Sequence, residues 1–469
     1  MRRFLASSVI ALSLAGCVNM APDHARPALP TAAAYDPQLR PDGTVIASTL
    51  SWREWFEDPR LMALIETALA GNRDLMAATA RIEQARAQYR VEDSRKLPAP
   101  VASAAASRSR VPLGTVSPGA SGASTADRFE VGVGVTGFEL DFWGRIANLS
   151  EAARAQYLAA EANQRSFYLS LIADVASTYF ALREAEEQID LAQATLESRQ
   201  EGLRIARLRL DAGVTSALPF RQAETLLTTA EQQLAAQRLA QAQLQNQLVV
   251  LLGNPAPANL PAPLPMAEQE NGIELDAGLP SDLMLVRPDI LAAEEQLRAA
   301  RANIGAARAA FFPSISLTGS AGFASTELGD LFGNDGLTWS FGPSISLPIF
   351  DWGEREANLD LAKAREVEQV ALYEKAVQEA FGEVSDALAG RRWLAEQVAA
   401  QEQGVAAQER IAYLARLRYR EGVADYLEVL DAERNLFSAR QQLLTSRRAL
   451  LQNATTLFVA LGGGLAPAR

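Results

Sequence analysis

The chain has 469 residues, 48% of them apolar, and a formal net charge of −12. An acidic chain of this kind lacks the basic surface that a nucleic-acid-binding protein needs. Because His24 is its one histidine and Cys17 its one cysteine, Cys/His zinc sites, disulfide frameworks and Ser-His or Cys-His catalytic pairs are excluded. The glycine-rich loop that binds nucleotide phosphates is also absent from the sequence. We therefore expect neither an enzyme nor a nucleic-acid partner.

The first 17 residues resemble a bacterial lipoprotein signal. Two arginines precede an apolar run at residues 4–14, which is shorter than the roughly 20 residues that span a bilayer. The run ends in Leu14-Ala15-Gly16-Cys17, which resembles the lipobox, where cleavage precedes a lipidated cysteine. We therefore expect a signal peptide over 1–16 and a covalent lipid on Cys17, with no other cofactor and no metal site. The alternative is a buried cysteine near an ordinary cleavage site.

Residues 17–57 are rich in proline, alanine and aspartate, a composition typical of an extended segment. We interpret them as a lipid-anchored tether. More than one acyl chain on Cys17 would hold the protein stably in membrane lipid. Val18, by analogy with bacterial lipoproteins, suggests sorting to the outer membrane. Asp58 and Pro59 then fit the N-cap and the first turn of a helix, where the folded part of the chain begins.

The rest of the chain contains an internal duplication. Residues 207–214 match residues 416–423 at an offset of 209, and Trp143-Gly144 matches Trp352-Gly353 at the same offset. The sequence therefore predicts a first repeat over 58–253, a proline-rich linker over 254–280, a second repeat over 281–462 and a C-terminal tail over 463–469.

Upstream of these matches the offset changes to 215, because Leu97-Pro98 matches Phe312-Pro313. The six-residue difference falls between Pro98 and Trp143, where the first copy is longer. A single change of length in one loop region is what a duplicated unit would show. Chance similarity between alanine-rich helices would not also reproduce the shared glycine and proline positions.

Each repeat is predicted to contain a helix, two strands, a very long helix, a turn and a further helix. The segment 145–211 has no proline and, at ~1.5 Å per residue, would form a helix about 100 Å long. Its apolar residues follow a 3.5-residue spacing, which is typical of supercoiled helices. The expected elements are strands at about 98–142, helices over 145–211 and 217–252, strands at about 313–350, and helices over 354–420 and 426–461. A cytoskeletal or adaptor coiled coil would share the helices but would leave the strands unexplained.

The strands carry the pattern of a transmembrane β-barrel. Over 129–135, 313–324 and 337–350, apolar residues alternate with small or polar residues, as transmembrane strands do; the stretch at 98–111 is only weakly patterned. A soluble sandwich would also alternate, but four strands separated by such long helices cannot form its core. Four strands cannot close a barrel, and eight would give a filled one. We therefore expect at least three chains, whose twelve strands enclose a lumen lined by small polar residues, with apolar residues facing lipid.

Several segments together resemble one family of proteins. They are residues 281–283, 287–290, 304–317, 347–350, 418–423 and 426–432. With them the chain resembles the outer-membrane factor, or TolC-type, family of tripartite efflux pumps, in its OprM-like, NodT-type lipoprotein branch. The resemblance implies a mainly α fold with membrane β-strands, in which a homotrimer builds a twelve-stranded outer-membrane β-barrel and a periplasmic α-barrel of coiled-coil helices. It also implies an equatorial belt made from the termini and the linker.

The function that the resemblance implies is that of an exit duct rather than an enzyme. Drugs or other toxic small molecules would pass from an inner-membrane pump, expected to be of the RND type, through a periplasmic adaptor to the exterior. The duct would lie in the outer membrane of a Gram-negative bacterium, be anchored by lipid, extend into the periplasm and confer multidrug resistance. Ducts for metal-ion efflux and for type I protein secretion share this architecture and are the alternatives. The six methionines are scattered, so no relay for copper is visible.

The implied periplasmic gate lies on the helix after the second turn. Leu427 would narrow the channel, Asp431 would give a ring of three carboxylates, and Arg434 could pair with Glu433, Asp431 or another protomer. Tyr419 would lie nearby on the preceding helix. Without the resemblance, Asp431 and Arg434 would be interpreted as an ordinary solvated i, i+3 pair.

The two turns are the implied docking sites for the adaptor. Gly213 and Gly422 permit the turn conformation, and Val214 and Val423 follow them. The first repeat departs from the second, because Gln222 stands where the second repeat has its gate carboxylate. We therefore assign the gate mainly to the second repeat, whose opening would be a relaxation of helix pairs once the adaptor binds.

Overall fold

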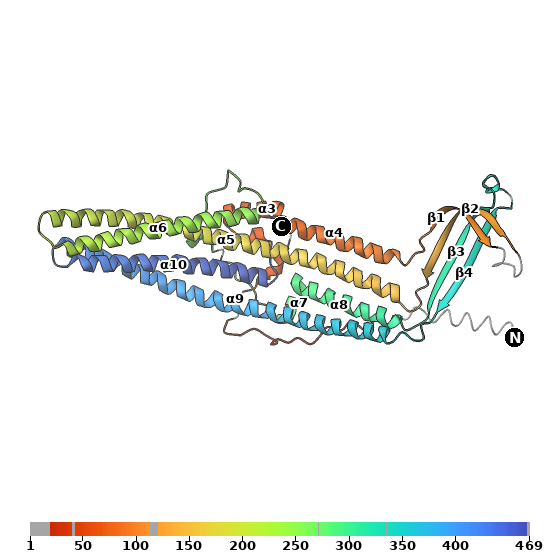
Figure 1. Cartoon of the computed structure of the whole chain (residues 1–469). Coiled ribbons are helices and arrows are strands. Elements are labelled where there is room, and N and C mark those ends of the chain that lie inside the picture. The colour runs from red at the N-terminus through yellow and green to blue at the C-terminus, as the bar shows by residue number, and fades with distance from the viewer. Residues whose placement is uncertain (1–18, 40–42, 113–120, 271, 334, 467–469) are drawn as a thin grey trace. The chain divides into compact units, whose positions relative to one another are not determined.

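The computed structural model describes residues 19–39, 43–112, 121–270, 272–333 and 335–466, and Figure 1 shows its helices and strands. The expected signal peptide and Cys17 lie outside these residues. The chain divides into two compact units. The first contains Met1–Pro27, Ile82–Ala159 and Ala293–Tyr373, and the second contains Ala28–Arg81, Ala160–Ala292 and Glu374–Arg469.

The first unit contains a four-stranded antiparallel sheet in the order β1-β2-β3-β4. Its strands are β1 (Val101–Pro112), β2 (Ala123–Glu139), β3 (Ser314–Ser325) and β4 (Leu337–Ser346). Strands β1 and β4 form the two edges of the sheet (Figure 1). The prediction of a mainly helical chain with four strands is confirmed, including β1, whose sequence pattern was weak.

Small side chains allow the helices of the first unit to pack closely. Helix α8 (Pro288–Ala309) and the start of α5 (Arg145–Asp211) share a cluster of four buried alanines. The cluster consists of Ala152, Ala155, Ala299 and Ala302. Because alanine has only one side-chain carbon, helix backbones can approach each other closely at these positions.

The first described residues of the chain, 19–26, are bound to α8. Arg308 donates a hydrogen bond to the Met20 carbonyl at 3.0 Å, and Arg301 donates one to the Ala25 carbonyl at 2.7 Å. Glu294 accepts a hydrogen bond from the Arg26 Nε–H at 2.9 Å and lies 3.2 Å from Nε2 of His24. This part of the expected tether is therefore held by a polar network.

The C-terminal part of the expected tether is folded into the second unit. Residues Ala47–Thr49 form a 3₁₀ turn, and α2 (Trp52–Trp55) follows it. Trp55 stacks on Phe458 with ring centroids 4.6 Å apart, and the Trp52 indole donates a hydrogen bond to the Tyr168 hydroxyl at 3.2 Å. The expectation of an extended segment up to residue 57 was wrong here, because burial of these aromatic side chains outweighs the polar, proline-rich composition.

The first repeat begins with two helices where one was predicted. They are α3 (Pro59–Gly71) and α4 (Arg73–Ser94), separated by Asn72, whose backbone is extended. The Asn72 side chain caps α4 by accepting a hydrogen bond from the Leu75 N–H at 2.8 Å. Asp58 caps α3 as predicted, accepting from the Arg60 N–H at 2.8 Å, and its other oxygen accepts from the Tyr179 hydroxyl at 2.5 Å.

Each of the two longest helices is followed, after a short turn, by a second long helix. Helices α5 (Arg145–Asp211) and α9 (Glu354–Arg420) have 67 residues each, and they lead into α6 (Ala217–Leu252) and α10 (Tyr426–Ala460). In the second unit, α5 and α6 pack through Ile189, Ala192 and Leu234. The remaining helices are α7 (Leu283–Val286) and the 3₁₀ turns Met266–Glu268, Pro280–Asp282 and Leu328–Asp330.

Within the described residues, no helix combines the length and the apolar character that a membrane span requires.

Candidate functional site

The two hairpin turns have the same backbone structure. At the first turn, the Gly213 N–H donates to the Leu210 carbonyl at 2.9 Å and the Val214 N–H donates to the Arg209 carbonyl at 3.0 Å. At the second, the corresponding bonds run from Gly422 to Tyr419 at 3.1 Å and from Val423 to Arg418 at 2.9 Å. This pair of bonds is the Schellman motif, which satisfies the last carbonyls of a helix. The duplication therefore extends to the geometry of the turns.

Both turns require glycine for the same reason. Gly213 has φ 69° and Gly422 has φ 73°, values in the left-handed region. Apart from the glycine and its two neighbours in the chain, no atom of the described residues lies within 4 Å of the position where either glycine would carry a Cβ. The backbone angle, rather than lack of space, therefore explains the two glycines.

The valines after these glycines are exposed. Val214 is 66% exposed and Val423 is 70% exposed. In a Schellman motif the residue at this position commonly makes an apolar contact with a residue in the last turn of its own helix. Here the residues at that helix position are arginines, Arg209 and Arg418, so no apolar partner is present there. Each turn therefore presents an apolar side chain to its surroundings, as a surface for a partner would.

A cavity of about 460 Å³ lies between the two turns, within the second unit. It brings together four of the predicted residues, which are Val214 from the first turn and Tyr419, Gly422 and Leu427 from the second hairpin. Gly213 and Val423 lie at the turns but do not line the cavity. Leu218 also lines the cavity. It lies 209 residues before Leu427, which is the offset between the two repeats. The offset alone identifies Leu218 as the counterpart of Leu427 in the first repeat, although the sequence argument did not name it.

Tyr419 connects three helices. Arg209 of α5 donates a hydrogen bond to the Tyr419 hydroxyl, and its guanidinium lies 5.0 Å from the centroid of the Tyr419 ring. On the other side, the Tyr419 and Tyr426 rings are 5.1 Å apart. Burial raises the pKa of the Tyr426 hydroxyl, which lies where a Cβ on Gly202 would clash. The sequence argument named Tyr419 but not Arg209, Tyr426 or Gly202 as its partners.

The predicted gate residues of α10 lie on an exposed face of that helix. Leu427 is exposed, and Arg434 forms an ion pair with Asp431 at 3.2 Å. Among the ion-pair partners that the sequence suggested for Arg434, the structure therefore shows Asp431. Both charged side chains are at least half exposed, so the pair contributes little to stability. The opposite face, with Val429, Ala432 and others, is buried against α9.

Glu433 belongs to a different cluster. Its Oε1 lies 2.9 Å from Nε of Arg416 in α9, close enough for an ion pair. Among the described residues, however, no donor is oriented to form a hydrogen bond with this oxygen. Arg199 of α5 is only 7% exposed and interacts electrostatically with Glu433 and Tyr426. Burial lowers the pKa of the Arg199 guanidinium, and the two acidic groups oppose this shift. In the sequence, Arg199 interrupts the 3.5-residue apolar spacing between Leu196 and Leu203.

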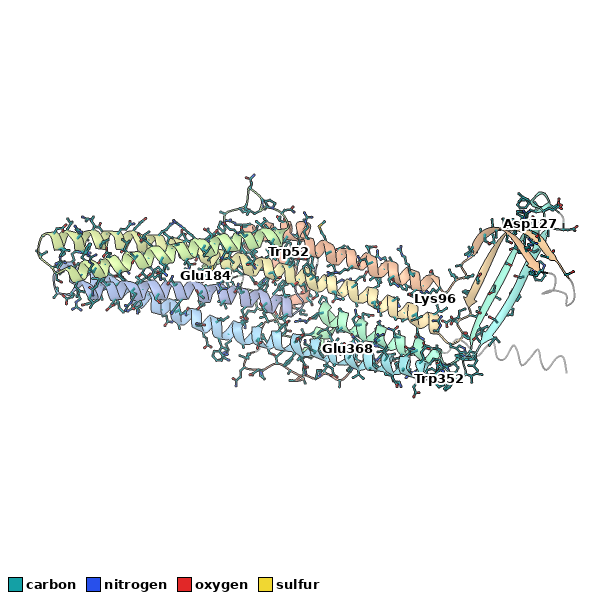
Figure 2. All side chains as sticks on the ribbon, in the orientation of Figure 1. Trp52, Lys96, Asp127, Glu184, Trp352 and Glu368 are labelled. Atoms are coloured by element: carbon teal, nitrogen blue, oxygen red, sulfur yellow. The ribbon has the colours of Figure 1, made fainter. Side chains whose placement is uncertain are left out.

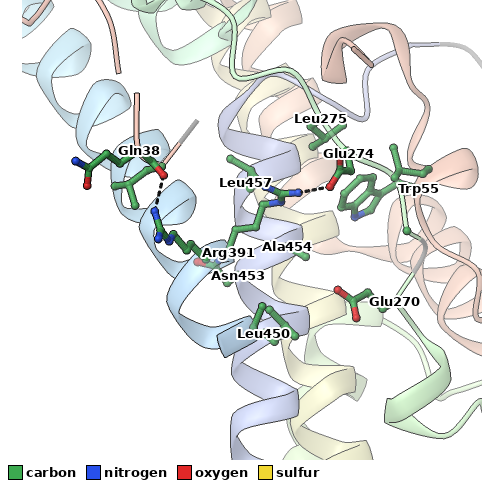
Figure 3. A pocket seen from close by; sticks show the side chains of 15 residues that line it. Gln38, Trp55, Glu270, Glu274, Leu275, Arg391, Leu450, Asn453, Ala454 and Leu457 are labelled. Atoms are coloured by element: carbon green, nitrogen blue, oxygen red, sulfur yellow. Dashed lines mark hydrogen bonds and ion pairs between the residues drawn. The ribbon is translucent and has the colours of Figure 1, made fainter. Parts of the chain in front are cut away.

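A second cavity of about 460 Å³, shown in Figure 3, lies where the linker meets α9 and α10. Arg391 forms an ion pair with Glu274 at 2.8 Å, and Arg392 donates to the Gln38 carbonyl at 2.8 Å. Trp55 and Leu457 also line it. These contacts tie the linker and the N-terminal segment to the helices of the same unit.

The described residues contain no cluster of three His, Cys, Asp or Glu side chains that could hold a metal ion.

Comparison with known proteins relates the whole chain to outer-membrane channels. The family model described as outer membrane efflux protein matches residues 64–254 and 279–463. The toluene efflux pump outer membrane protein TtgC of Pseudomonas putida is 42% identical over 99% of this chain and 96% of its own length. The cation efflux system protein CusC of Escherichia coli is 40% identical over 97% of this chain and 98% of its own.

A solved structure agrees with these matches. The open state of the Neisseria gonorrhoeae MtrE outer membrane channel has a TM-score of 0.88 and 41% identity, covering 96% of this chain and 99% of the MtrE chain. The agreement includes both the helical hairpins and the strands, since almost nothing of either chain is left unmatched.

Proposed function

This chain belongs to the outer membrane efflux protein family, and we propose that it forms the outer-membrane exit channel of a tripartite efflux system. Three copies enclose the channel in the outer membrane and extend into the periplasm of a Gram-negative bacterium. An inner-membrane pump of the RND type supplies the energy, and a periplasmic adaptor joins the pump to the channel.

The observation that carries this proposal is the combination of an open-edged sheet and 67-residue helices in one chain. Each chain supplies four antiparallel strands with two free edges. Three chains would join these edges into a twelve-stranded barrel, which is wide enough to enclose a lumen. The long helices of the three chains would form a periplasmic α-barrel, with residues 254–280 in an equatorial belt.

The turns are the sites at which we place the adaptor. Val214 and Val423 are exposed apolar side chains held outward by the two Schellman turns at Gly213 and Gly422. An adaptor with helical hairpins would bury them by packing against α5, α6, α9 and α10. Burial of each valine favours association by about 1.5–2 kcal/mol before the entropic cost of binding.

We place the periplasmic gate at Leu427, Asp431, Arg434 and Tyr419. Leu427 narrows the channel, and three copies of Asp431 form a carboxylate ring. The weak, exposed pair between Asp431 and Arg434 can exchange partners at low cost, as an opening gate requires. Tyr419 holds α9 to α5 through Arg209, so a shift of this helix pair would move the gate.

The lipid anchor is a separate part of the proposal. Cleavage before Cys17 and lipidation of its thiol would place the anchor only three residues before Met20, which Arg308 holds on α8. Mass spectrometry of the N-terminal peptide tests this directly. A mature chain that starts at another residue, or an unmodified Cys17, would contradict it.

Small toxic organic molecules are the cargo we propose, and metal ions are the second candidate. TtgC, a toluene efflux protein, and CusC, a cation efflux protein, are almost equally similar to this chain, at 42% and 40% identity. Overall similarity to the relatives therefore does not separate the two cargoes. Selection of the cargo lies mainly in the pump.

Susceptibility of a strain that lacks the gene tests the function. We expect greater sensitivity to dyes, detergents, solvents and antibiotics, restored by the wild-type gene. Sensitivity to copper or silver alone would favour the metal-ion alternative, and loss of a secreted protein without any drug sensitivity would favour type I secretion.

A further inference from the structure

Trp143, which follows β2, makes a specific contact with the residues just before β3 in the first unit. Its ring stacks on Phe312 with centroids 4.7 Å apart and planes at 28°. Its indole N–H donates a hydrogen bond to the Pro313 carbonyl at 2.8 Å. Strands β2 and β3 are neighbours in the sheet, so this contact fastens the junction between the first hairpin and the second.

The duplicated copy of this contact is incomplete within one chain. Trp352 is the repeat counterpart of Trp143, and Leu97-Pro98 is the counterpart of Phe312-Pro313. Trp352 follows β4 and Leu97 precedes β1, and these strands form opposite edges of the sheet. Trp352 is 90% exposed and Leu97 is 70% exposed. Figure 2 shows Trp352 at the segment that leads from β4 into α9.

The backbone at the two tryptophans also differs. Gly144 and Gly353 follow them with φ 72° and 89°, so the local turn is shared. Trp352 itself has φ 57°, whereas Trp143 has an ordinary negative φ. A bulky residue in the left-handed region is strained. Trp352 and Phe350 of the same chain have ring centroids 4.7 Å apart at an interplanar angle of 64°. Among the described residues, Trp352 has neither the stacked partner nor the carbonyl acceptor that Trp143 has.

We propose that Trp352 packs against Leu97 and Pro98 of the partner subunit, completing between protomers the contact that Trp143 makes within one. The indole N–H of Trp352 would then donate to the Pro98 carbonyl of the partner subunit. This inference rests on the proposed trimer and specifies how its sheets are joined. A closed ring of three chains would contain six such tryptophan contacts, three within chains and three between them.

The same symmetry gives the strand register between subunits. In the first hairpin Ala104 pairs with Val131, and in the second Gly319 pairs with Phe341. The hairpins therefore correspond at offsets of 215 for β1 to β3 and 210 for β2 to β4. The second offset exceeds 209 by one because β2 has an extra residue at its bulge between Val135 and Phe138.

Applying these offsets to the junction between β2 and β3 predicts the pairs across the subunit boundary. Val131 pairs with Phe323 within the chain, so Phe341 should face Arg108 of the partner subunit. By the same rule Trp339 should face Arg110 of the partner subunit. Both pairs place a guanidinium beside an exposed aromatic ring, which is a favourable cation–π arrangement.

Thiol cross-linking tests the contact in the full chain. The double variant Leu97→Cys/Trp352→Cys is treated with a short bifunctional thiol reagent, because stacked rings hold backbones farther apart than a disulfide allows. We expect covalent dimers and trimers on denaturing gels. The matched control, Trp143→Cys/Phe312→Cys, should cross-link within one chain and run as a monomer, and the parent chain with Cys17 alone gives the background.

The outcomes separate the contact from the assembly. A double variant that is trimeric by native mass spectrometry but gives no intermolecular product, while the control pair reacts, would overturn the contact and indicate that Trp352 lies against lipid. A parent chain that is not trimeric would overturn the proposed assembly as well. As a test that does not remove the tryptophan, Leu97→Phe recreates Phe312 at the first copy and should raise the temperature at which the trimer dissociates. An unchanged or lower temperature would count against the contact.

Discussion

At the scale of single residues, the two turn glycines are set by backbone geometry alone. Gly422→Ala places a Cβ on a backbone with φ 73°, where space is available but the angle is unfavourable. We expect the variant to lose about 1–2 kcal/mol of unfolding free energy, measured by chemical denaturation in detergent.

Gly404→Ala is the matched control for this variant. Gly404 lies inside α9 and also has open space around its would-be Cβ, but its backbone is helical. Alanine should therefore stabilise the helix there by about 0.5–1 kcal/mol. Equal destabilisation by both substitutions would show that the backbone angle at Gly422 is not the cause.

Glu294 should control how firmly residues 19–26 are bound. Burial favours its neutral form, but hydrogen bonds from Arg26 and His24 outweigh this and lower the pKa of Glu294. The ionised carboxylate therefore stabilises the folded segment above the ordinary glutamate pKa of about 4.3, and this stability is lost as the pH falls through the lowered value. Glu294→Gln should release residues 19–26 at neutral pH, seen as faster hydrogen exchange in that peptide.

Glu295→Gln provides the adjacent control. Burial raises the pKa of Glu295, and its pair with Arg298 is an i, i+3 contact within α8. Its loss should leave exchange of residues 19–26 unchanged. Similar exchange in both variants would mean that loss of charge on α8, rather than the bonds to Arg26 and His24, explains the effect.

At the scale of the elements, α5, α9 and α10 meet around Glu433. Its carboxylate faces Arg416 and balances the buried Arg199. Glu433→Gln would leave a guanidinium buried without its opposing charge, so we expect a loss of about 2–3 kcal/mol in unfolding free energy. Glu428→Gln removes a comparable but exposed pair with Arg418 and should cost under about 1 kcal/mol. Equal costs would show that Arg199 does not depend on Glu433.

The elements also show which features a sequence can predict. Long periodic helices such as α5 and α9 follow from spacing and from the absence of proline, and the turns follow from repeated glycines. The break at Asn72 was missed, because the apolar pattern continues across it. In the structure the extended backbone of Asn72 and its side-chain cap on α4 mark the break. The folding of Trp52 and Trp55 was missed for another reason. Their partners Tyr168 and Phe458 are distant in sequence, so composition could not show that these aromatic side chains find a core.

In the candidate site, too, some residues could be named from the sequence and others could be found only in the structure. Four residues that were named from the sequence line one cavity, namely Val214, Tyr419, Gly422 and Leu427. Arg209 and Gly202 were not identified as their partners, because each lies in the other repeat and reaches Tyr419 or Tyr426 only through the packing of α5 on the second hairpin. Contacts between repeats cannot be derived from the pattern within either one.

At the scale of the whole molecule, the proposed trimer turns one exposed carboxylate per chain into a ring. Three copies of Asp431 around a narrow passage would attract cations and repel anions. Asp431→Asn keeps the size of the side chain and removes its charge, so it should lower the cation-over-anion permeability ratio, measured as a shift of the reversal potential across a planar bilayer with a salt gradient.

Glu428→Gln is the control for this measurement, since Glu428 lies one turn of α10 before Asp431 and is paired with Arg418 across the hairpin. Its removal takes the same formal charge from each chain but should leave the reversal potential nearly unchanged, because we place Asp431, and not Glu428, on the wall of the narrow passage. If both variants shifted the potential equally, selectivity would reflect the total charge of the turn region. A local ring at Asp431 would then no longer be needed to explain it.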